Sequence, residues 1–245
     1  MSNMWGFIRR QRELLSEQER VTRLLTMRRK DPRGLNEQDF VQAGAALGCH
    51  PAKVKAFYAV ESSNEGFDSQ GRLKILYEPH QVHRATSGIL TGRKFDWRWN
   101  QKDMQIPLSY RSWKPLTNAI RHDPEQWHPY KEDENGQWQM LASAYQFHPG
   151  ALAGASYGGF QILGRNAISL GYASPLHMIE ELYESEGAHL EAAIRFLRRN
   201  RAIPALKAGD WATLTRIYRG SGASGAKQHA ARLARAHERA TKVFA

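Results

Sequence analysis

The segment over residues 51–78 changes its hydrophobic period within a few positions, and this change constrains the fold more than any other feature. Its first part places Val54, Phe57 and Tyr58 at the spacing of one helical face. Residues 73–77 instead carry apolar side chains at every second position, as a strand does, and the sequence DSQG before them is a turn signal. We therefore expect a helix that is followed directly by a small β-hairpin.

Glu61 takes the next position on the apolar face of this helix. A carboxyl group that is removed from water holds its proton more tightly, so its pKa rises. A carboxylic acid that stays protonated near neutral pH is what general acid catalysis requires. The structural alternative is a buried glutamate that binds a helix end or an arginine, and the residues alone leave both interpretations open.

The rest of the chain reads mainly as helices. Residues 91–135 are the exception, because they are rich in Trp, Arg, Asp and Pro and show weak periodicity, so we expect an irregular insertion there. We expect an amphipathic basic helix within residues 1–33 and a mainly α domain over residues 34–245. Spacing, caps and breakers predict helices over residues 6–29, 36–47, 80–87, 174–197 with a break near Gly187, 210–220, and from 226 onward. Asn36 and Asp210 are the expected caps of two of these helices, and Asp39, three residues after Asn36, gives a variant of the capping box.

Composition and charge limit the class of protein. The 245 residues carry a formal net charge of +11, with basic ends and a slightly acidic centre. This distribution suits a polyanionic partner such as nucleic acid, anionic lipid or an anionic cell envelope. Cys49 is the only cysteine, which excludes an intrachain disulfide and favours a reducing compartment. No apolar run approaches the ~20 residues of a membrane span, and we expect no secretory signal at the N-terminus.

Two motifs further along the chain are similar to elements of the lysozyme-like superfamily. The sequence ASYGGFQILG at residues 155–164 resembles the Gly-x-x-Gln element that lines the saccharide cleft of lysozymes and lytic transglycosylases. The sequence RIYRGSG at residues 216–222 resembles their Tyr-Asn-Gly element. Together with the segments 34–88, 135–164 and 177–220, these motifs resemble the phage-type N-acetylmuramidase family. The resemblance covers about residues 34–240 apart from the insertion.

This resemblance implies a lysozyme-like α+β fold, mainly α, with the hairpin next to the catalytic helix. It implies cleavage of the peptidoglycan bond between N-acetylmuramic acid and N-acetylglucosamine, without a cofactor. The protein would be a phage endolysin, a monomer made in the host cytoplasm that reaches the cell wall in the periplasm through a holin or similar device. A virion-associated enzyme is the alternative.

The resemblance also assigns roles to carboxylates. The catalytic glutamate of the family falls on Glu61. The family often has an aspartate nine residues later, but here that position is Gln70, which cannot act as a base or a nucleophile and is assigned to substrate binding. Asp68 and Glu78 are the candidates for a second carboxylate, of which we favour Glu78. Asp68 also fits a plain turn residue, and Glu78 could instead bind an arginine or a helix N-terminus.

Three further positions match substrate-binding elements of the family. Ser156 could help to hold a water molecule or could be only a helix cap. Gln161 matches the Gly-x-x-Gln element, and Tyr218 matches the tyrosine whose hydroxyl contacts the catalytic glutamate, although Tyr218 also lies on an apolar stripe. Glu186 lies on the core stripe of its helix, where we expect a structural acceptor.

Two other features leave alternatives open. His80 and His83 form an HxxH pair, but a zinc site needs a third ligand, so we expect no metal. A lone catalytic glutamate would favour lytic transglycosylation, in which the 6-hydroxyl of the sugar attacks and leaves a 1,6-anhydro end. A basic nucleic-acid-binding protein or a virion structural protein is the alternative from another class, although no nucleic-acid motif is present.

The basic ends suggest one more interaction. Arg232, Arg235 and Arg239 share a broad face of the last predicted helix, with Leu233 and Ala240 among its apolar residues. Such a helix can attach to an anionic envelope surface. The alternative is a closing helix that packs on the domain and leaves its arginines solvated.

Overall fold

The computed structural model of the protein describes residues 19, 22–62, 65–99, 102–112, 134–220 and 224–245. Most of the predicted N-terminal helix over residues 6–29 therefore lies outside the described residues, as does most of the predicted insertion. The described chain is mostly helical and divides into two compact units. The first unit contains residues 1–28, 75–156 and 163–166, and the second contains residues 29–74, 157–162 and 167–245.

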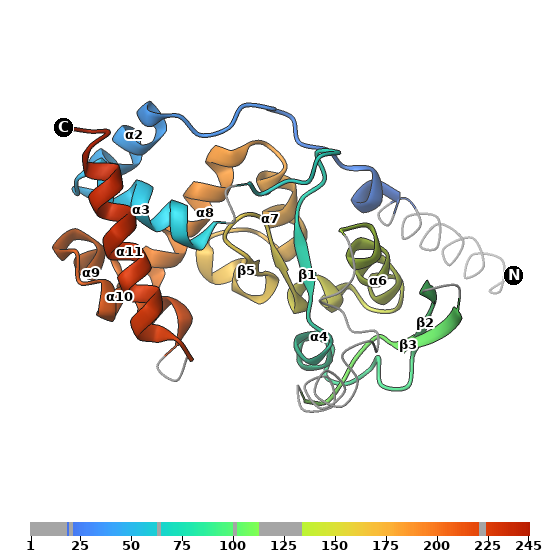
Figure 1. Ribbon diagram of the computed structural model, residues 1–245. Coiled ribbons are helices and arrows are strands. Elements are labelled where there is room, and N and C mark those ends of the chain that lie inside the picture. The colour runs from blue at the N-terminus through green and yellow to red at the C-terminus, as the bar shows by residue number, and fades with distance from the viewer. Residues whose placement is uncertain (1–18, 20–21, 63–64, 100–101, 113–133, 221–223) are drawn as a thin grey trace, which may run out of the picture. The chain divides into compact units, whose positions relative to one another are not determined.

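The second unit consists mainly of helices, which Figure 1 shows in blue and cyan for its first part and in orange and red for its last. Its helices are α2 (Glu37–Leu47), α3 (Pro51–Glu61), the 3₁₀ helix η4 (Ile168–Leu170), α7 (Pro175–Leu182), α8 (Glu186–Arg199), α9 (Ile203–Ala208), α10 (Trp211–Arg219) and α11 (Ala226–Thr241).

Local sequence signals set the ends of α2 and α3. The Asn36 side chain accepts from the Asp39 backbone N–H, and the Asp39 side chain accepts from that of Asn36, which completes the predicted capping box. Gly48 ends α2 in the left-handed conformation, at a φ of 63°. Pro51 occupies the first turn of α3, where its missing N–H costs no hydrogen bond. Both predicted helices are confirmed.

The break between α7 and α8 lies earlier than predicted. The predicted break was at Gly187, but α8 already begins at Glu186 because the Ser185 side chain accepts from the backbone N–H of Ala188. Gly187 therefore lies inside the first turn of α8, where a glycine is tolerated.

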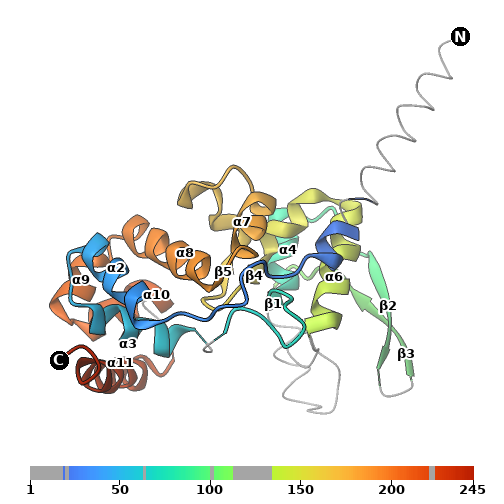
Figure 2. The same cartoon turned by 90° about the horizontal axis from the view of Figure 1, so that it is seen from above.

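The last helix, α11, packs against α3 and α10 (Figures 1 and 2). Its start at Ala226 and the cap of α10 by Asp210 are as predicted. The apolar side chains of Leu233, Ala236 and Ala240 are buried in this contact. The closing-helix alternative is thus confirmed for the apolar face of α11, and these residues are not available to enter a lipid surface.

The first unit contains both strands and helices. They are β1 (Ile75–Tyr77), α4 (Pro79–Ala85), β2 (Lys94–Trp99), β3 (Lys102–Pro107), α6 (Glu134–Phe147), and the 3₁₀ helices η2 (Pro149–Gly154) and η3 (Gly164–Asn166). Strands β2 and β3, green in Figure 1, form an antiparallel hairpin in which Lys94 pairs with Pro107. The expectation of irregular structure is therefore wrong for residues 94–107. Residues 113–133 of the predicted insertion lie outside the residues that the structure describes.

The predicted hairpin after α3 is present in reduced form. Phe67 and Leu73 form one antiparallel bridge, and the Asp68 backbone N–H donates to the carbonyl oxygen of Arg72 at 2.8 Å. The strand itself, β1, instead joins β4 (Ala155–Tyr157) and β5 (Ile162–Leu163) in a three-stranded sheet of order β1-β4-β5. The period change was recognised correctly, but the partner of the strand comes from a segment about 80 residues further along the chain, which alternation cannot identify.

Candidate active site

Glu61 is the last residue of α3, and its side chain is only 8% exposed. The face of α3 that leads to it is apolar, with Ala52, Val54 and Phe57 almost fully buried. Ser62 ends the helix with extended backbone, and its hydroxyl donates to the Tyr58 carbonyl oxygen at 2.8 Å. The predicted placement of a carboxyl group on the buried face of a helix end is confirmed.

His229 of α11 lies directly against this carboxyl group. Its Nε2 is 2.6 Å from Oε1 of Glu61, and the side chain of His229 is 5% exposed. The other ring nitrogen, Nδ1, is 2.9 Å from the hydroxyl of Thr215 on α10. The approach to Glu61 is short, but Oε1 does not lie along the ring N–H direction, so this buried oxygen has no well-directed hydrogen bond.

Burial raises the pKa of Glu61 to about 7, although the positive charges of Arg219 and Arg232 act in the opposite direction. Burial also lowers the pKa of His229, and the same two arginines lower it further. Both effects favour a proton on the carboxyl group and a neutral imidazole. Glu61 can therefore be a proton donor near neutral pH.

Tyr218 and Gln161 lie in the same unit as Glu61. The Tyr218 hydroxyl donates to the Phe160 carbonyl oxygen at 3.0 Å, so the contact with Glu61 that the resemblance implied is not made in this structure. Burial, and secondarily the charge of Glu61, raises the pKa of Tyr218. Gln161 is exposed and has a positive φ of 49°, and its side-chain amide donates to the Gly158 carbonyl oxygen at 2.9 Å.

Two buried side chains of α8, Glu186 and His189, accept hydrogen bonds from the loops that contain Gly66 and Gly159. The Glu186 carboxylate accepts from the Gly66 backbone N–H at 2.7 Å, which confirms the predicted structural acceptor. The Gly159 backbone N–H donates to Nδ1 of His189 at 3.3 Å, and Nε2 of His189 lies 2.9 Å from the Leu182 carbonyl oxygen. Burial lowers the pKa of His189 to about 4, so this imidazole is neutral at physiological pH.

The predicted second carboxylate, Glu78, lies in the first unit between β1 and α4. The hydroxyl of Ser156 donates to its Oε1 at 2.7 Å. Ser156 belongs to strand β4, so the helix-cap alternative for this residue is wrong. Burial raises the pKa of Glu78, while the Ser156 hydrogen bond and the charge of Arg165 act to lower it.

The residue before Glu78 is fixed from two sides. The Tyr77 backbone N–H donates to Oε1 of Gln137 at 2.7 Å, and the Tyr77 hydroxyl donates to the Leu108 carbonyl oxygen. His80, two residues after Glu78, has its Nε2 3.9 Å from Oε2 of that carboxylate. Glu78 is thus held at a defined position in its unit, although the start of α4 takes no side-chain cap from it.

Asp68 and Gln70 lie in the turn before β1. The Asp68 carboxylate accepts from the backbone N–H groups of Gln70 and Arg72, each at 2.9 Å, and from Nε of Arg72 at 2.8 Å. Burial raises the pKa of Asp68, but these hydrogen bonds outweigh it, so the pKa lies below its ordinary value. This arrangement is that of a turn residue, and it leaves little of the carboxylate for chemistry. The Gln70 side chain is exposed.

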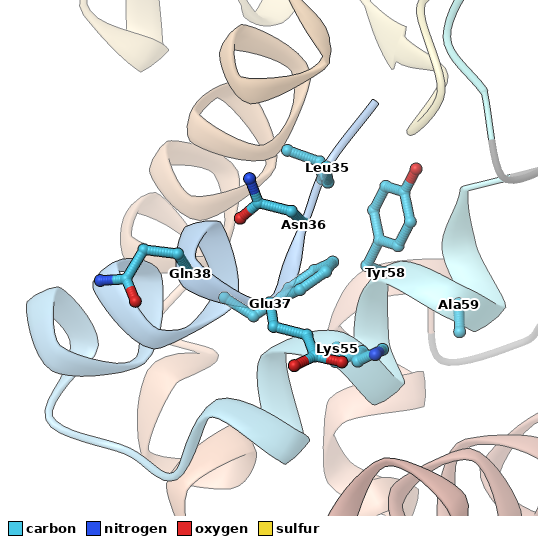
Figure 3. A pocket seen from close by; sticks show the side chains of 8 residues that line it. Leu35, Asn36, Glu37, Gln38, Lys55, Tyr58 and Ala59 are labelled. Carbon is cyan, nitrogen blue, oxygen red and sulfur yellow. The ribbon is translucent and has the colours of Figure 1, made fainter. Parts of the chain in front are cut away.

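A separate concavity of about 780 Å³ lies between the start of α2 and α3 (Figure 3). Phe40 and Tyr58 contribute aromatic rings whose centroids are 5.4 Å apart, and Glu37 and Lys55 contribute charges of opposite sign. Glu61 and the predicted substrate-binding residues do not line it. We assign it no catalytic role.

Within the described ranges, no group of three His, Cys, Asp or Glu side chains is arranged to hold a metal ion. Among the helices that the structure describes, none is long and apolar enough to cross a membrane.

The sequence patterns did not predict roles for His229 and Thr215. His229 nevertheless precedes the buried residues Leu233, Ala236 and Ala240 by four, seven and eleven positions. A polar residue on an apolar stripe is the same signal that identified Glu61. Thr215 gives no such signal, because a threonine beside a buried leucine is common in helices.

The mainly helical fold with a small three-stranded sheet, and a carboxyl group buried at a helix end, define a lysozyme-like protein. The N-acetylmuramidase family model matches residues 50–241, so the chain belongs to the N-acetylmuramidase family. Among solved structures, the chain is similar to the crystal structure of Burkholderia AP3 phage endolysin, with 27% identity and a TM-score of 0.64. The similarity covers 89% of this chain and 74% of that one. Among curated protein sequences, none gives a significant match.

Proposed function

We propose that this protein is a peptidoglycan-degrading N-acetylmuramidase of the endolysin type that cleaves the bond between N-acetylmuramic acid and N-acetylglucosamine, with Glu61 as the general acid. The observation that carries the proposal is the burial of Glu61 at the end of α3, which raises its pKa to about 7. Membership of the N-acetylmuramidase family and similarity to a phage endolysin support the substrate.

In the proposed reaction, the Glu61 carboxyl group gives its proton to the glycosidic oxygen as the bond to the anomeric carbon breaks. The departing sugar leaves with a new hydroxyl, and positive charge develops on the sugar that remains. Hydrolysis then requires a group that activates water or stabilises this charge. We propose Glu78 for this role rather than Asp68, because Arg72 and two backbone N–H groups already occupy the Asp68 carboxylate.

The first test compares Glu61→Gln with the wild-type protein on purified peptidoglycan. Glutamine has nearly the shape of glutamate but cannot donate a carboxyl proton, so the variant should fold normally by circular dichroism and lose lysis. Near-full activity of Glu61→Gln would exclude Glu61 as the general acid. Clearing of a peptidoglycan zymogram by the wild-type protein also separates an enzyme from a nucleic-acid-binding or virion structural protein.

A lytic transglycosylase is the second candidate, and Gln70 favours it because this position lacks the carboxylate of the family. Mass spectrometry of the released muropeptides separates the two reactions: hydrolysis adds water and leaves reducing ends, whereas transglycosylation leaves 1,6-anhydro ends. If the products carry reducing ends, Glu78→Gln should reduce their formation strongly and Asp68→Asn should not. Anhydro products together with an active Glu78→Gln variant would establish transglycosylation.

A further inference from the structure

Three polar side chains from three helices form a chain that ends at Glu61. Thr215 on α10 lies 2.9 Å from Nδ1 of His229 on α11, and Nε2 of His229 lies 2.6 Å from Oε1 of Glu61 on α3. Thr215 and His229 are 1% and 4% exposed, so water does not compete for these contacts. Burying three polar groups in a row costs free energy unless each has a hydrogen-bond partner. The donor or acceptor role of a group at one contact therefore limits its role at the next contact.

The order of donors and acceptors in this chain decides which oxygen of Glu61 carries the proton. A neutral imidazole has one N–H and one acceptor nitrogen. If the Thr215 hydroxyl donates to Nδ1, the ring hydrogen must reside on Nε2, which faces Oε1 of Glu61. Oε1 is then the acceptor of an N–H group, and the carboxyl proton is left to Oε2.

We propose that His229 is a positioning residue: Thr215 holds it in the neutral Nε2–H form, and His229 holds Oε1 of Glu61 so that the catalytic proton is presented on Oε2. This inference rests on the proposed function, because it gives His229 a role only toward a general acid. It makes the apolar packing of α11 on α3 part of the active site.

The charges around the pair favour this arrangement over an ion pair. A protonated His229 beside an ionised Glu61 would leave no proton to donate. Arg219 on α10 and Arg232 on α11 both oppose a positive charge on His229, and burial opposes it too. Tyr218 on α10 also senses the Glu61 charge, which contributes to raising its pKa, and the phenol is neutral. Burial keeps the proton on Glu61 despite the two arginines.

In the resting protein Oε1 lies off the Nε2–H direction, so the hydrogen bond is not yet well aligned. Hydrogen bonds of catalytic groups are often poorly aligned without substrate and tighten when it binds. The role of His229 is therefore expected in turnover more than in substrate affinity. Without His229, the Glu61 carboxyl group could rotate and would transfer its proton less effectively. Contacts between the protein and the rest of the sugar would be unchanged.

The tautomer can be measured without reference to activity. Nitrogen-15 shifts of the His229 ring at pH 7 should show hydrogen on Nε2 and an acceptor at Nδ1. Thr215→Val removes the hydroxyl and keeps the shape, so it should shift the ring toward a mixture of tautomers, and Thr215→Ser should restore the wild-type spectrum. A cationic ring or an Nδ1–H form in the wild-type protein would overturn the proposal.

Kinetics on soluble glycan fragments give the second readout. His229→Leu and Thr215→Val should lower kcat about 10- to 100-fold with little change in KM. His229→Gln, whose amide N–H can still reach Oε1, should keep more activity than His229→Leu, and Thr215→Ser should recover it. Circular dichroism and thermal unfolding verify that each variant is folded.

The same variants distinguish a failure of the proposed function from a failure of the role of His229. An active Glu61→Gln variant would remove the proposed function itself. An inactive Glu61→Gln variant, together with folded and fully active His229→Leu and Thr215→Val variants, would leave the function in place and refute the role of His229.

Discussion

Gly66 lies where the chain after α3 passes the ring of His189, and replacing it with alanine should destabilise the protein strongly. A Cβ atom at this position would lie 1.7 Å from Nδ1 and 1.9 Å from Cε1 of His189. The ring would have to move by about 1.3 Å to reach even a 3.0 Å contact. That movement breaks its hydrogen bonds with Gly159 and Leu182, because the ring is 1% exposed and has no space in which to turn.

The size of the effect follows from these losses. Overpacking a close-packed core costs about 1–3 kcal/mol, and a buried polar group left without a partner costs about 1–3 kcal/mol more. We therefore expect Gly66→Ala to lower the free energy of unfolding by about 2–6 kcal/mol, a large share of the about 5–15 kcal/mol that typical domains possess. Urea unfolding followed by circular dichroism measures this directly.

Two controls isolate the steric cause. Gly34→Ala places its Cβ in open space, so it should change the free energy of unfolding by less than about 0.5 kcal/mol. In a His189→Ala background the ring is absent, and Gly66→Ala should then cost less than about 1 kcal/mol, because the two changes share one contact. A small effect of Gly66→Ala in the wild-type protein, or an equal effect with and without the His189 ring, would refute the reasoning.

Three other predictions concern charge and capping. Activity should fall as pH rises through about 7 because Glu61 loses its proton. The raised pKa of Glu61 also means that the folded state loses stability as pH rises from about 4.5 to 7. The stability of Glu61→Gln relative to wild type should therefore increase over that pH window, and a constant difference would contradict this. Neutralising Arg235 and Arg239, which are exposed on α11, should weaken binding to anionic envelopes at low salt and spare activity on soluble fragments; equal loss on both would contradict envelope attachment. Asn36→Ala should cost about 1 kcal/mol of stability by thermal unfolding, and no change would mean that the capping box contributes nothing.

The sequence was informative where one residue acts within one element. The N-caps Asn36 and Asp210 follow from local backbone chemistry, and both were predicted, as was the start of α11 at Ala226. Glu61 was found because a carboxylate on an apolar stripe contradicts the pattern around it. Glu186 was identified as a structural acceptor for the same reason, and its bond to Gly66 confirms it.

The misses concern partners that are distant in the chain. His229 lies 168 positions after Glu61 by residue number, and no local pattern connects the two. Strand β1 is an edge strand that pairs with β4, the central strand of its sheet, rather than with the segment just before it. A two-stranded hairpin alone is at best marginally stable, whereas a third strand adds a further pairing. The β2–β3 hairpin was missed although charged and aromatic residues alternate along β2, from Lys94 and Phe95 to Arg98 and Trp99, so the strand signal was present in the sequence.

The backbone conformation of Gln161 has a consequence for stability that the sequence motif does not show. Its φ of 49° lies in the left-handed region, which costs a non-glycine residue roughly 1 kcal/mol. Glycine would relieve that cost but would also lose the side-chain hydrogen bond to the Gly158 carbonyl oxygen, which contributes about 0.5–1.5 kcal/mol. The two effects are of similar size and opposite sign. Gln161→Gly should therefore change the free energy of unfolding by less than about 1 kcal/mol, and a large loss of activity in this variant would support the substrate contact that we propose for the side chain.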